Sequence, residues 1–158
     1  MSEHTMVIDA PVGPLLLRTD GDSITGVTFV DASPEPSDAP LLREAAHQLD
    51  AYFAGDLKEF DLPLDPSGTD FQRRVWAALL EVSYGETASY GEIATRLGLP
   101  LSSSRAIGLA NGSNPIAIVV PCHRIIGADG SLTGYGGGLQ NKRLLLQLEQ
   151  SQRDDVLF

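Results

Sequence analysis

The sequence predicts an N-terminal α/β domain, made of a small antiparallel sheet and a helix, followed by a mostly α-helical C-terminal domain with a helix-turn-helix. Three observations support this fold class. The first thirty residues alternate short apolar runs with turn signals, which is typical of antiparallel strands. Further along, apolar residues recur at helical spacing, and the short turn GLPL (98–101) separates two such helical segments. We place the domains at 1–68 and 69–158.

The N-terminal domain begins with three predicted strands, each bounded by turn signals. They are TMVIDA (5–10), LLLRT (15–19) and ITGVTFV (24–30), with PVGP and DGDS between them. The acidic, proline-rich segment 31–40 is expected to be a mobile surface loop. A helix is predicted over 41–53 with Gly55 as its C′ residue, and segment 59–66 alternates like one further edge strand.

The C-terminal domain opens with a helix over 69–82. Thr69 or Asp70 is its N-cap, and Trp76 lies on its apolar face, where core packing is the simplest role for an indole.

The helix-turn-helix is predicted from the next two segments. SYGE (89–92) fits a capping box and begins a helix that stops at Gly98. The second helix takes Ser102 or Ser103 as its cap and ends near residues 111–112. Many helical hairpins bind nothing, so the motif alone leaves DNA binding open.

Two further elements complete this domain. The β-branched, apolar run IAIVV (116–120) predicts a short buried strand or a core segment that leads directly into Pro121 and Cys122. A glycine-rich stretch follows, and then a C-terminal helix over 139–150 whose Leu145 and Leu148 are expected to face the core.

Length and composition indicate a protein that folds without covalent cross-links. The chain has 158 residues, of which 42% are hydrophobic, and only one cysteine. One cysteine allows no internal disulfide, which favours a reducing compartment, so we expect a cytoplasmic protein. No run approaches the length of about 18 apolar residues that a membrane span needs, and we expect no membrane association.

The net charge of the whole chain argues against nucleic acid as a partner, but the distribution of charge along the chain does not. The formal charge is −10, from 21 acidic and 11 basic residues. Acidic residues dominate the first 70 positions and the tail, whereas the second half holds a set of basic residues that leaves a local basic face possible. They are Arg73, Arg74, Arg96, Arg105, Arg124, Lys142 and Arg143.

Cys122 is the candidate nucleophile, because His123 and Arg124 follow it directly. A buried cysteine is most often a small apolar side chain, but an imidazole or guanidinium nearby would lower its pKa and favour the reactive thiolate. Adjacent residues of a strand point in opposite directions, so we expect a water to bridge Cys122 and His123. Glu149 could fix the tautomer of His123, or it could be a solvated helix residue. His4 and His47 are expected at the surface.

Several chemistries are excluded by what the sequence lacks. No second cysteine is present to resolve a disulfide, which excludes thioredoxin-type chemistry. Clusters of cysteine and histidine at zinc-ligand spacing are missing, as are a Walker-type loop and a dinucleotide-binding fingerprint. The sequence therefore implies neither a metal nor a cofactor.

The motifs PCHR (121–124), SYGEIA (89–94), SRAIG (104–108) and NPI (114–116) together resemble those of the O6-alkylguanine-DNA alkyltransferases, also called methylated-DNA–protein-cysteine methyltransferases. LTGYGGGL (132–139) and LLLQLE (144–149) extend the resemblance, which covers residues 69–149 with the motifs in order. Over 1–68 the likeness is looser and rests on PVGPLLL and AYFAG.

The resemblance implies roles for individual residues. Cys122 would accept the alkyl group from O6 of guanine, and His123, oriented by Glu149, would deprotonate it through a water. Tyr90 would donate a hydrogen bond or a proton to guanine N3 and crowd the adjacent phosphate. Asn114 would tie the helix-turn-helix to the active-site segment. Because the thioether product has no regenerating partner, each molecule would react once.

The resemblance also implies how DNA is bound. The target atom lies inside the duplex, so the base must be flipped out, and Arg105 would fill the space that it leaves. The second helix would enter the minor groove, where small residues permit close approach. The DNA-binding set would be Tyr90, Ser102, Ser103, Arg105, Ala106, Gly108 and Gly112.

The base pocket would be formed by Ile125, Tyr135 and the glycine loop, together with Asn114. Gly136 stands where some members of the family have serine, and a wider pocket could admit larger alkyl groups. The extra cysteines that bind a structural zinc in some members are absent here.

The expected function is therefore single-turnover repair of O6-alkylguanine in double-stranded DNA, with O4-alkylthymine as an open second substrate. We expect a monomer in solution, and cooperative assembly on DNA stays open. Three alternatives remain at this point: a sensor that binds alkylguanine without repairing it, a cysteine hydrolase that uses the same residues, and a helix-turn-helix module without chemistry.

Overall fold

The computed structural model describes residues 3–156, and the side chains of residues 3–151. The chain forms two compact units that meet between Ser67 and Gly68. Residues 1–2 of the expected first domain and residues 157–158 of the expected second domain lie outside the described residues.

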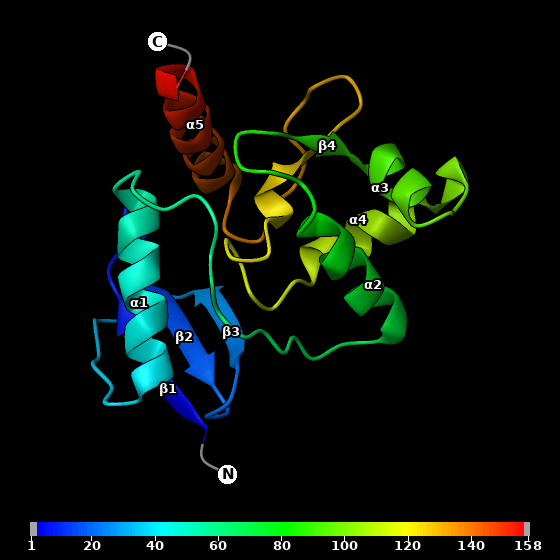
Figure 1. Ribbon diagram of the computed structural model, residues 1–158. Helices are drawn as coiled ribbons and strands as arrows, with labels where there is room; N and C mark the ends of the chain where they lie inside the picture. Colours follow the sequence, from blue (N-terminus) through cyan, green and yellow to red (C-terminus); the bar gives the residue numbers. More distant parts are fainter. Residues whose placement is uncertain (1–2, 157–158) are drawn as a thin grey trace. The chain divides into compact units, whose positions relative to one another are not determined.

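The first unit is a three-stranded antiparallel sheet with one helix across it (Figure 1). The strands are β1 (His4–Ile8), β2 (Leu15–Thr19) and β3 (Ile24–Phe29), in the order β1-β2-β3. Helix α1 (Pro40–Phe53) contacts all three strands. Leu15, Leu17, Leu42, Leu49 and Tyr52 are fully buried between the sheet and the helix. The three predicted strands, the helix and the C′ role of Gly55, whose φ is 83°, are confirmed.

Segment 31–40 is a largely exposed surface loop, as predicted, and it is tied to the edge of the sheet because Glu35 exchanges two backbone hydrogen bonds of 2.9 Å with Val7. One prediction for this unit needs correction. Segment 59–66 forms no full edge strand and pairs with β3 only at an isolated bridge between Leu64 and Ile24. This bridge consists of two backbone hydrogen bonds, from the Ile24 N–H to the carbonyl of Pro63 (2.8 Å) and from the Asp65 N–H to the carbonyl of Ile24 (3.0 Å), and Pro63 has no N–H with which to extend it.

The second unit is mainly helical. Its elements are α2 (Asp70–Leu79), β4 (Ala88–Ser89), α3 (Tyr90–Arg96), η1 (Leu101–Ser103), α4 (Ser104–Gly112), η2 (Cys122–Arg124), β5 (Ile125–Ile126) and α5 (Leu139–Val156). Helices α2, α3 and α4 lie together, and η2 packs against both α2 and α5 (Figure 1).

Local signals explain where α2 and α3 begin and end. Thr69 caps α2 and Ser89 caps α3, each in a complete capping box, with Gln72 and with Glu92. Gly98, with φ of 71°, follows the end of α3 and turns the chain toward α4. The predicted helix-turn-helix is therefore α3, η1 and α4.

Trp76 fixes α2 against α4. Its indole is only 2% exposed, and its Nε1 donates a 2.8 Å hydrogen bond to the carbonyl of Ala110. The expected core role of Trp76 is confirmed, and its buried indole N–H is hydrogen-bonded, as buried indole groups usually are.

Of the two alternatives predicted for 116–120, the structure has the buried core segment and not the strand. All five residues are buried, but the segment forms turns, with hydrogen bonds from Val119 to Ala117 (2.8 Å) and from Val120 to Ile116 (3.0 Å). Ile118 has φ of 72°, a conformation that costs a β-branched residue free energy. The following residues, Cys122 to Arg124, form a single 3-10 turn instead of an extended continuation.

Short parallel pairing joins the start of α3 to the segment after η2. β4 pairs with β5, Ala88 opposite Ile125 and Ser89 opposite Ile126. Tyr90, the first residue of α3, is thereby held near the Cys122–Arg124 turn.

Helix α5 presents a polar stripe to the interior. Leu145 is buried as predicted, but Leu148 is only half-buried, while Lys142 and Glu149 on the same face are buried. No helix within the described residues is long and apolar enough to cross a membrane.

Candidate active site

The 3-10 turn η2 places Cys122, His123 and Arg124 in the interior, with exposures of 6%, 0% and 7%. Two asparagines at the end of the helix-turn-helix hold this turn. Asn111 donates to the carbonyl of Cys122 at 3.3 Å, and Asn114 donates to the carbonyl of Val120 at 2.8 Å. The end of α4 and the cysteine segment are therefore directly linked.

Glu149 is the shared partner of His123 and Arg124. Its Oε2 lies 2.7 Å from His123 Nε2, and Arg124 donates from Nε and Nη2 to the two carboxylate oxygens at 2.8 and 3.0 Å. Arg124 Nη1 also donates to the carbonyl of Val82 at 2.7 Å, and the guanidinium lies 5.7 Å from the ring centroid of Tyr84. Each buried charge is thus hydrogen-bonded, which offsets much of its desolvation cost.

These contacts fix the protonation states of the pair. Burial alone would raise the pKa of Glu149, but hydrogen bonds from His123 and Arg124 outweigh burial and lower that pKa to about 2. Burial lowers the pKa of His123 below its ordinary value. At neutral pH the imidazole is therefore neutral, with Nε2–H donating to the Glu149 carboxylate. Its other nitrogen, Nδ1, is buried and has no protein partner, so its lone pair is available as a base.

The thiol itself differs from the sequence-based expectation. Burial raises the pKa of Cys122, and a hydrogen bond from Asn114 and the charge of Lys142 oppose this only in part. The guanidinium of Arg124 does not activate the thiol because it is directed at Glu149. The resting form is the neutral thiol, and reaction requires a base to remove its proton.

Tyr90 lies at the edge of this cluster. Its hydroxyl hydrogen-bonds the hydroxyl of Thr133, and its ring lies beside α4, where a Cβ added to Gly108 would be 3.5 Å from it. Gly108 therefore faces Tyr90 and is only half-buried, whereas the sequence suggested that it faces the groove.

Lys142 was not predicted as a site residue. It is fully buried, and Nζ donates to the carbonyl of Ile125 at 2.6 Å and to the carbonyl and hydroxyl of Thr133 at 3.2 and 3.3 Å. Lys142 lies three residues before Leu145 and seven before Glu149, which places all three on one helix face. This spacing was the sequence signal that could have indicated its burial. Asn111 was likewise missed, and Arg124 was considered only as a group that could activate the thiol.

The basic residues divide into two groups. Arg124 and Lys142 are buried within the site and cannot contribute to a basic face. The other five of the set, Arg73, Arg74, Arg96, Arg105 and Arg143, are exposed.

Helix α4 exposes a narrow, mostly uncharged face. Arg105, Ala106, Leu109 and Gly112 are exposed along it, and Leu109, at 72%, was not among the predicted residues. Ser102 is exposed and Ser103 is half-buried. Ser103 occupies the N-cap position of α4, but its side chain makes no capping hydrogen bond.

The residues expected to form the base pocket differ in their exposure. Ile125 is fully buried, and its carbonyl accepts from Lys142. Tyr135 is half-buried, and burial together with the neighbouring Cys122 raises the pKa of its hydroxyl. Gly136 is exposed, with no atom within 4 Å of the place where a Cβ would stand.

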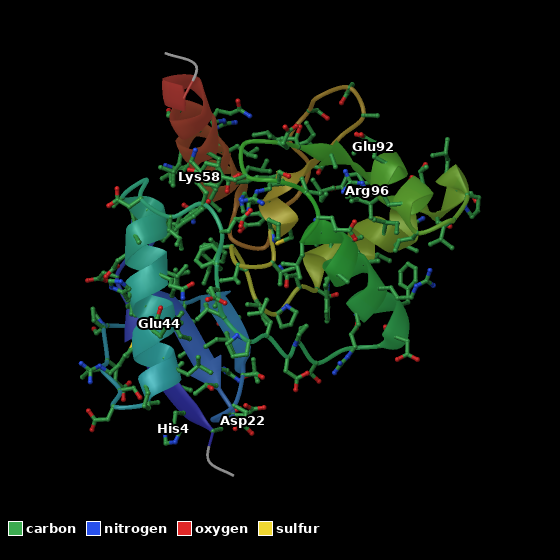
Figure 2. The ribbon with its side chains drawn as sticks, viewed as in Figure 1. His4, Asp22, Glu44, Lys58, Glu92 and Arg96 are labelled. Carbon is green, nitrogen blue, oxygen red and sulfur yellow. The ribbon has the colours of Figure 1, made fainter. Side chains whose placement is uncertain are left out.

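A cavity of about 710 Å³ opens beside Tyr90. Residues of α3, η1 and α4 line it, including Arg96, Leu101 and Ser104. Figure 2 labels Glu92 and Arg96 on α3, and both line this cavity. His4, also labelled there, is exposed, as is His47, in agreement with the sequence. Among the described residues no three His, Cys, Asp or Glu side chains are grouped to bind a metal ion.

Comparison with known proteins matches both units. The family description "6-O-methylguanine DNA methyltransferase, ribonuclease-like domain" matches residues 4–66, and "6-O-methylguanine DNA methyltransferase, DNA binding domain" matches residues 70–151. The methylated-DNA–protein-cysteine methyltransferase of Mycobacterium tuberculosis is 56% identical over 94% of this chain and 93% of its own. That of Methanosarcina acetivorans is 51% identical over 92% and 97%. A crystal structure of Mycobacterium tuberculosis OGT in complex with DNA is 55% identical, with a TM-score of 0.86 over 94% of both chains.

Glu149→Gln should destabilise the second unit by roughly 3–5 kcal/mol, because it leaves the guanidinium of Arg124 buried without its carboxylate. Urea unfolding followed by the fluorescence of Trp76, the only tryptophan, measures this. The exposed Glu81→Gln is the matched control and should stay within about 0.5 kcal/mol of wild type. Equal midpoints for the two variants would contradict this account.

Acidification should destabilise the second unit in two steps. The pKa of His123 is lowered from 6.5, so its contribution is present above pH 6.5 and is lost as pH falls below it. The pKa of Glu149 falls from 4.5 to about 2, so its contribution, roughly 3 kcal/mol, is present above pH 4.5 and is lost toward pH 2. Urea midpoints between pH 8 and 3 test this, and the second step should shrink in Glu149→Gln. A midpoint that rises below pH 6.5 would refute it.

Proposed function

The chain belongs to the 6-O-methylguanine DNA methyltransferase family, and on that premise we propose that it repairs DNA by irreversible transfer of the alkyl group of O6-alkylguanine to Cys122. The observation that carries this proposal is the arrangement at η2. A buried thiol stands next to a neutral imidazole whose free Nδ1 can take a proton and whose Nε2 is bonded to Glu149.

Activation of the thiol proceeds through His123. A water that bridges Sγ and Nδ1 receives the thiol proton and gives one of its own to the imidazole, because the raised pKa of Cys122 leaves little thiolate at rest. The imidazolium that results lies 2.7 Å from the Glu149 carboxylate, which stabilises its positive charge. Glu149 stays ionised throughout.

Transfer is a displacement at the alkyl carbon. The thiolate forms a bond to that carbon as the bond from carbon to O6 breaks, and the electron pair of the broken bond stays on guanine. Tyr90 supports the leaving guanine by a hydrogen bond or proton at N3. The product is a thioether, and the chain has no second cysteine to displace it. Each molecule therefore acts once.

Double-stranded DNA is the partner that we propose, bound along α4. Ala106 and Gly112 are exposed, and a methyl group and a glycine hydrogen are small enough for close approach to a minor groove. Arg105 is exposed on the same face and takes the place of the flipped base. Ser102 and Ser103, at the turn before α4, contact the backbone of the DNA.

The flipped base enters a pocket formed by Ile125, Tyr135 and Gly136. Asn114 supports that pocket from the end of α4 through its hydrogen bond to Val120. Gly136 is exposed and has no side chain, which favours acceptance of alkyl groups larger than methyl. Damage in the base, and not a base sequence, is what this site recognises.

A monomer in the cytoplasm is the working form that we propose, since all the residues of the reaction belong to one chain. The alternative of a sensor without repair has no observation in its favour, because Cys122 is present and lies beside a base. A hydrolase would need an oxyanion hole, and nothing in the site favours one.

Incubation with a duplex that carries one O6-methylguanine should add a single methyl group to the protein. The thioether is stable, so intact-mass spectrometry should find one methyl per molecule, with no further gain in excess DNA. Cys122→Ser should gain none. Release of a product without a mass change would favour a hydrolase, and tight binding without transfer would favour a sensor.

Arg105→Ala should slow repair of the duplex by about tenfold or more, since the flipped state then loses the side chain that fills the stack. The rate with the free base O6-benzylguanine should be unchanged, because no base is flipped in that reaction. Single-turnover rates measure both, with the exposed Arg143→Ala as the control for loss of one positive charge. Equal slowing with the free base would make Arg105 a structural residue instead.

A further inference from the structure

The buried ammonium of Lys142 has all three of its hydrogens engaged. Its acceptors are the carbonyl of Ile125 at 2.6 Å and the carbonyl and hydroxyl of Thr133 at 3.2 and 3.3 Å. An ammonium can only donate, so the hydroxyl oxygen of Thr133 must accept from Lys142. A fully buried lysine is rare, and these contacts offset its desolvation.

The hydroxyl of Thr133 joins this lysine to Tyr90. Its oxygen accepts from Lys142 and is also hydrogen-bonded to the Tyr90 hydroxyl. The positive charge of Lys142 favours the orientation in which the Thr133 hydrogen points away from it, toward the Tyr90 oxygen. In that orientation Tyr90 accepts from Thr133 and keeps its own hydrogen for another acceptor.

The arrangement is a chain of donors that ends at Tyr90. Hydrogen bonds in such a chain polarise one another, so an ammonium at its start makes the final hydroxyl a better donor. Without the Thr133 hydroxyl, the Tyr90 hydrogen could turn toward other acceptors. The carbonyl contacts of Lys142 to Ile125 and Thr133 would remain, because they belong to the backbone.

We propose that Thr133 and Lys142 are positioning residues that hold the Tyr90 hydroxyl as hydrogen-bond donor to the departing guanine. This inference rests on the proposed function. As the bond from carbon to O6 breaks, guanine receives an electron pair, and Tyr90 donates its hydrogen to N3. If the proton transfers fully, the Tyr90 oxygen recovers one from Thr133, which takes one from the Lys142 ammonium, so charge and protons balance.

Thr133→Val tests the role of the hydroxyl, because valine keeps the shape and the backbone carbonyl. With protein in saturating excess over an O6-methylguanine duplex, the single-turnover rate should fall tenfold or more. Thr133→Ser keeps a hydroxyl and should stay within about twofold of wild type. Thr133→Ala serves as a second variant without a hydroxyl. Thr28→Val makes the same change of residue in β3 of the other unit and should leave the rate at the wild-type value.

Methylation by iodomethane separates leaving-group assistance from thiol activation. The same methyl group moves to Cys122, but iodide needs no proton, so Thr133→Val and Thr133→Ala should react at the wild-type rate. Slowing in both reactions would show that Thr133 acts on the thiol or on folding, and would overturn the inference. So would an unchanged duplex rate in Thr133→Val while wild type repairs normally. Absence of transfer in wild type would overturn the proposed function itself.

Discussion

The carboxylate of Glu149, buried between His123 and Arg124, is the constraint on which the rest of the site depends. An unpaired charge at this depth would be costly, so both partners must reach it from the same short turn. That requirement fixes η2 against α5 and leaves His123 with its Nδ1 unoccupied. Because Arg124 is directed at the carboxylate and not at the thiol, the proposed reaction depends on His123 as the proton acceptor.

The second unit links this buried chemistry to an exposed helix over a short distance. Asn111 and Asn114 lie at the end of α4 and bond the backbone of the cysteine segment. β4 and β5 bring the first residue of α3 beside the residues that follow η2. The protein has a net charge of −10, and the exposed face of α4 carries one charged residue, Arg105. Two other basic residues of this unit, Arg124 and Lys142, are buried and do not add to that face.

Local patterns were enough to predict much of the fold. β2, the capping box of Ser89 and Glu92, and the core role of Trp76 depend on neighbouring residues and are found as expected. The contact of Glu149 with His123 was one of two alternatives that the sequence left open, and the structure has that contact. The pattern of 116–120 could not distinguish a strand from a buried core segment, because an apolar, β-branched run does not indicate the positive φ at Ile118. The helical spacing of Lys142 from Leu145 and Glu149 indicated the face on which it lies, but its acceptors at Ile125 and Thr133 belong to other segments and could not be predicted from that spacing.

The protonation of His123 is the most direct test of this account. Nitrogen NMR of the histidine rings at neutral pH, in a His4→Gln and His47→Gln background, reports His123 alone, because the chain has only these three histidines. The account predicts a neutral ring with the proton on Nε2, a bare Nδ1, and a pKa below the ordinary 6.5. A proton on Nδ1 at neutral pH, in either a neutral or a charged ring, would mean that His123 cannot accept the thiol proton and would contradict the mechanism.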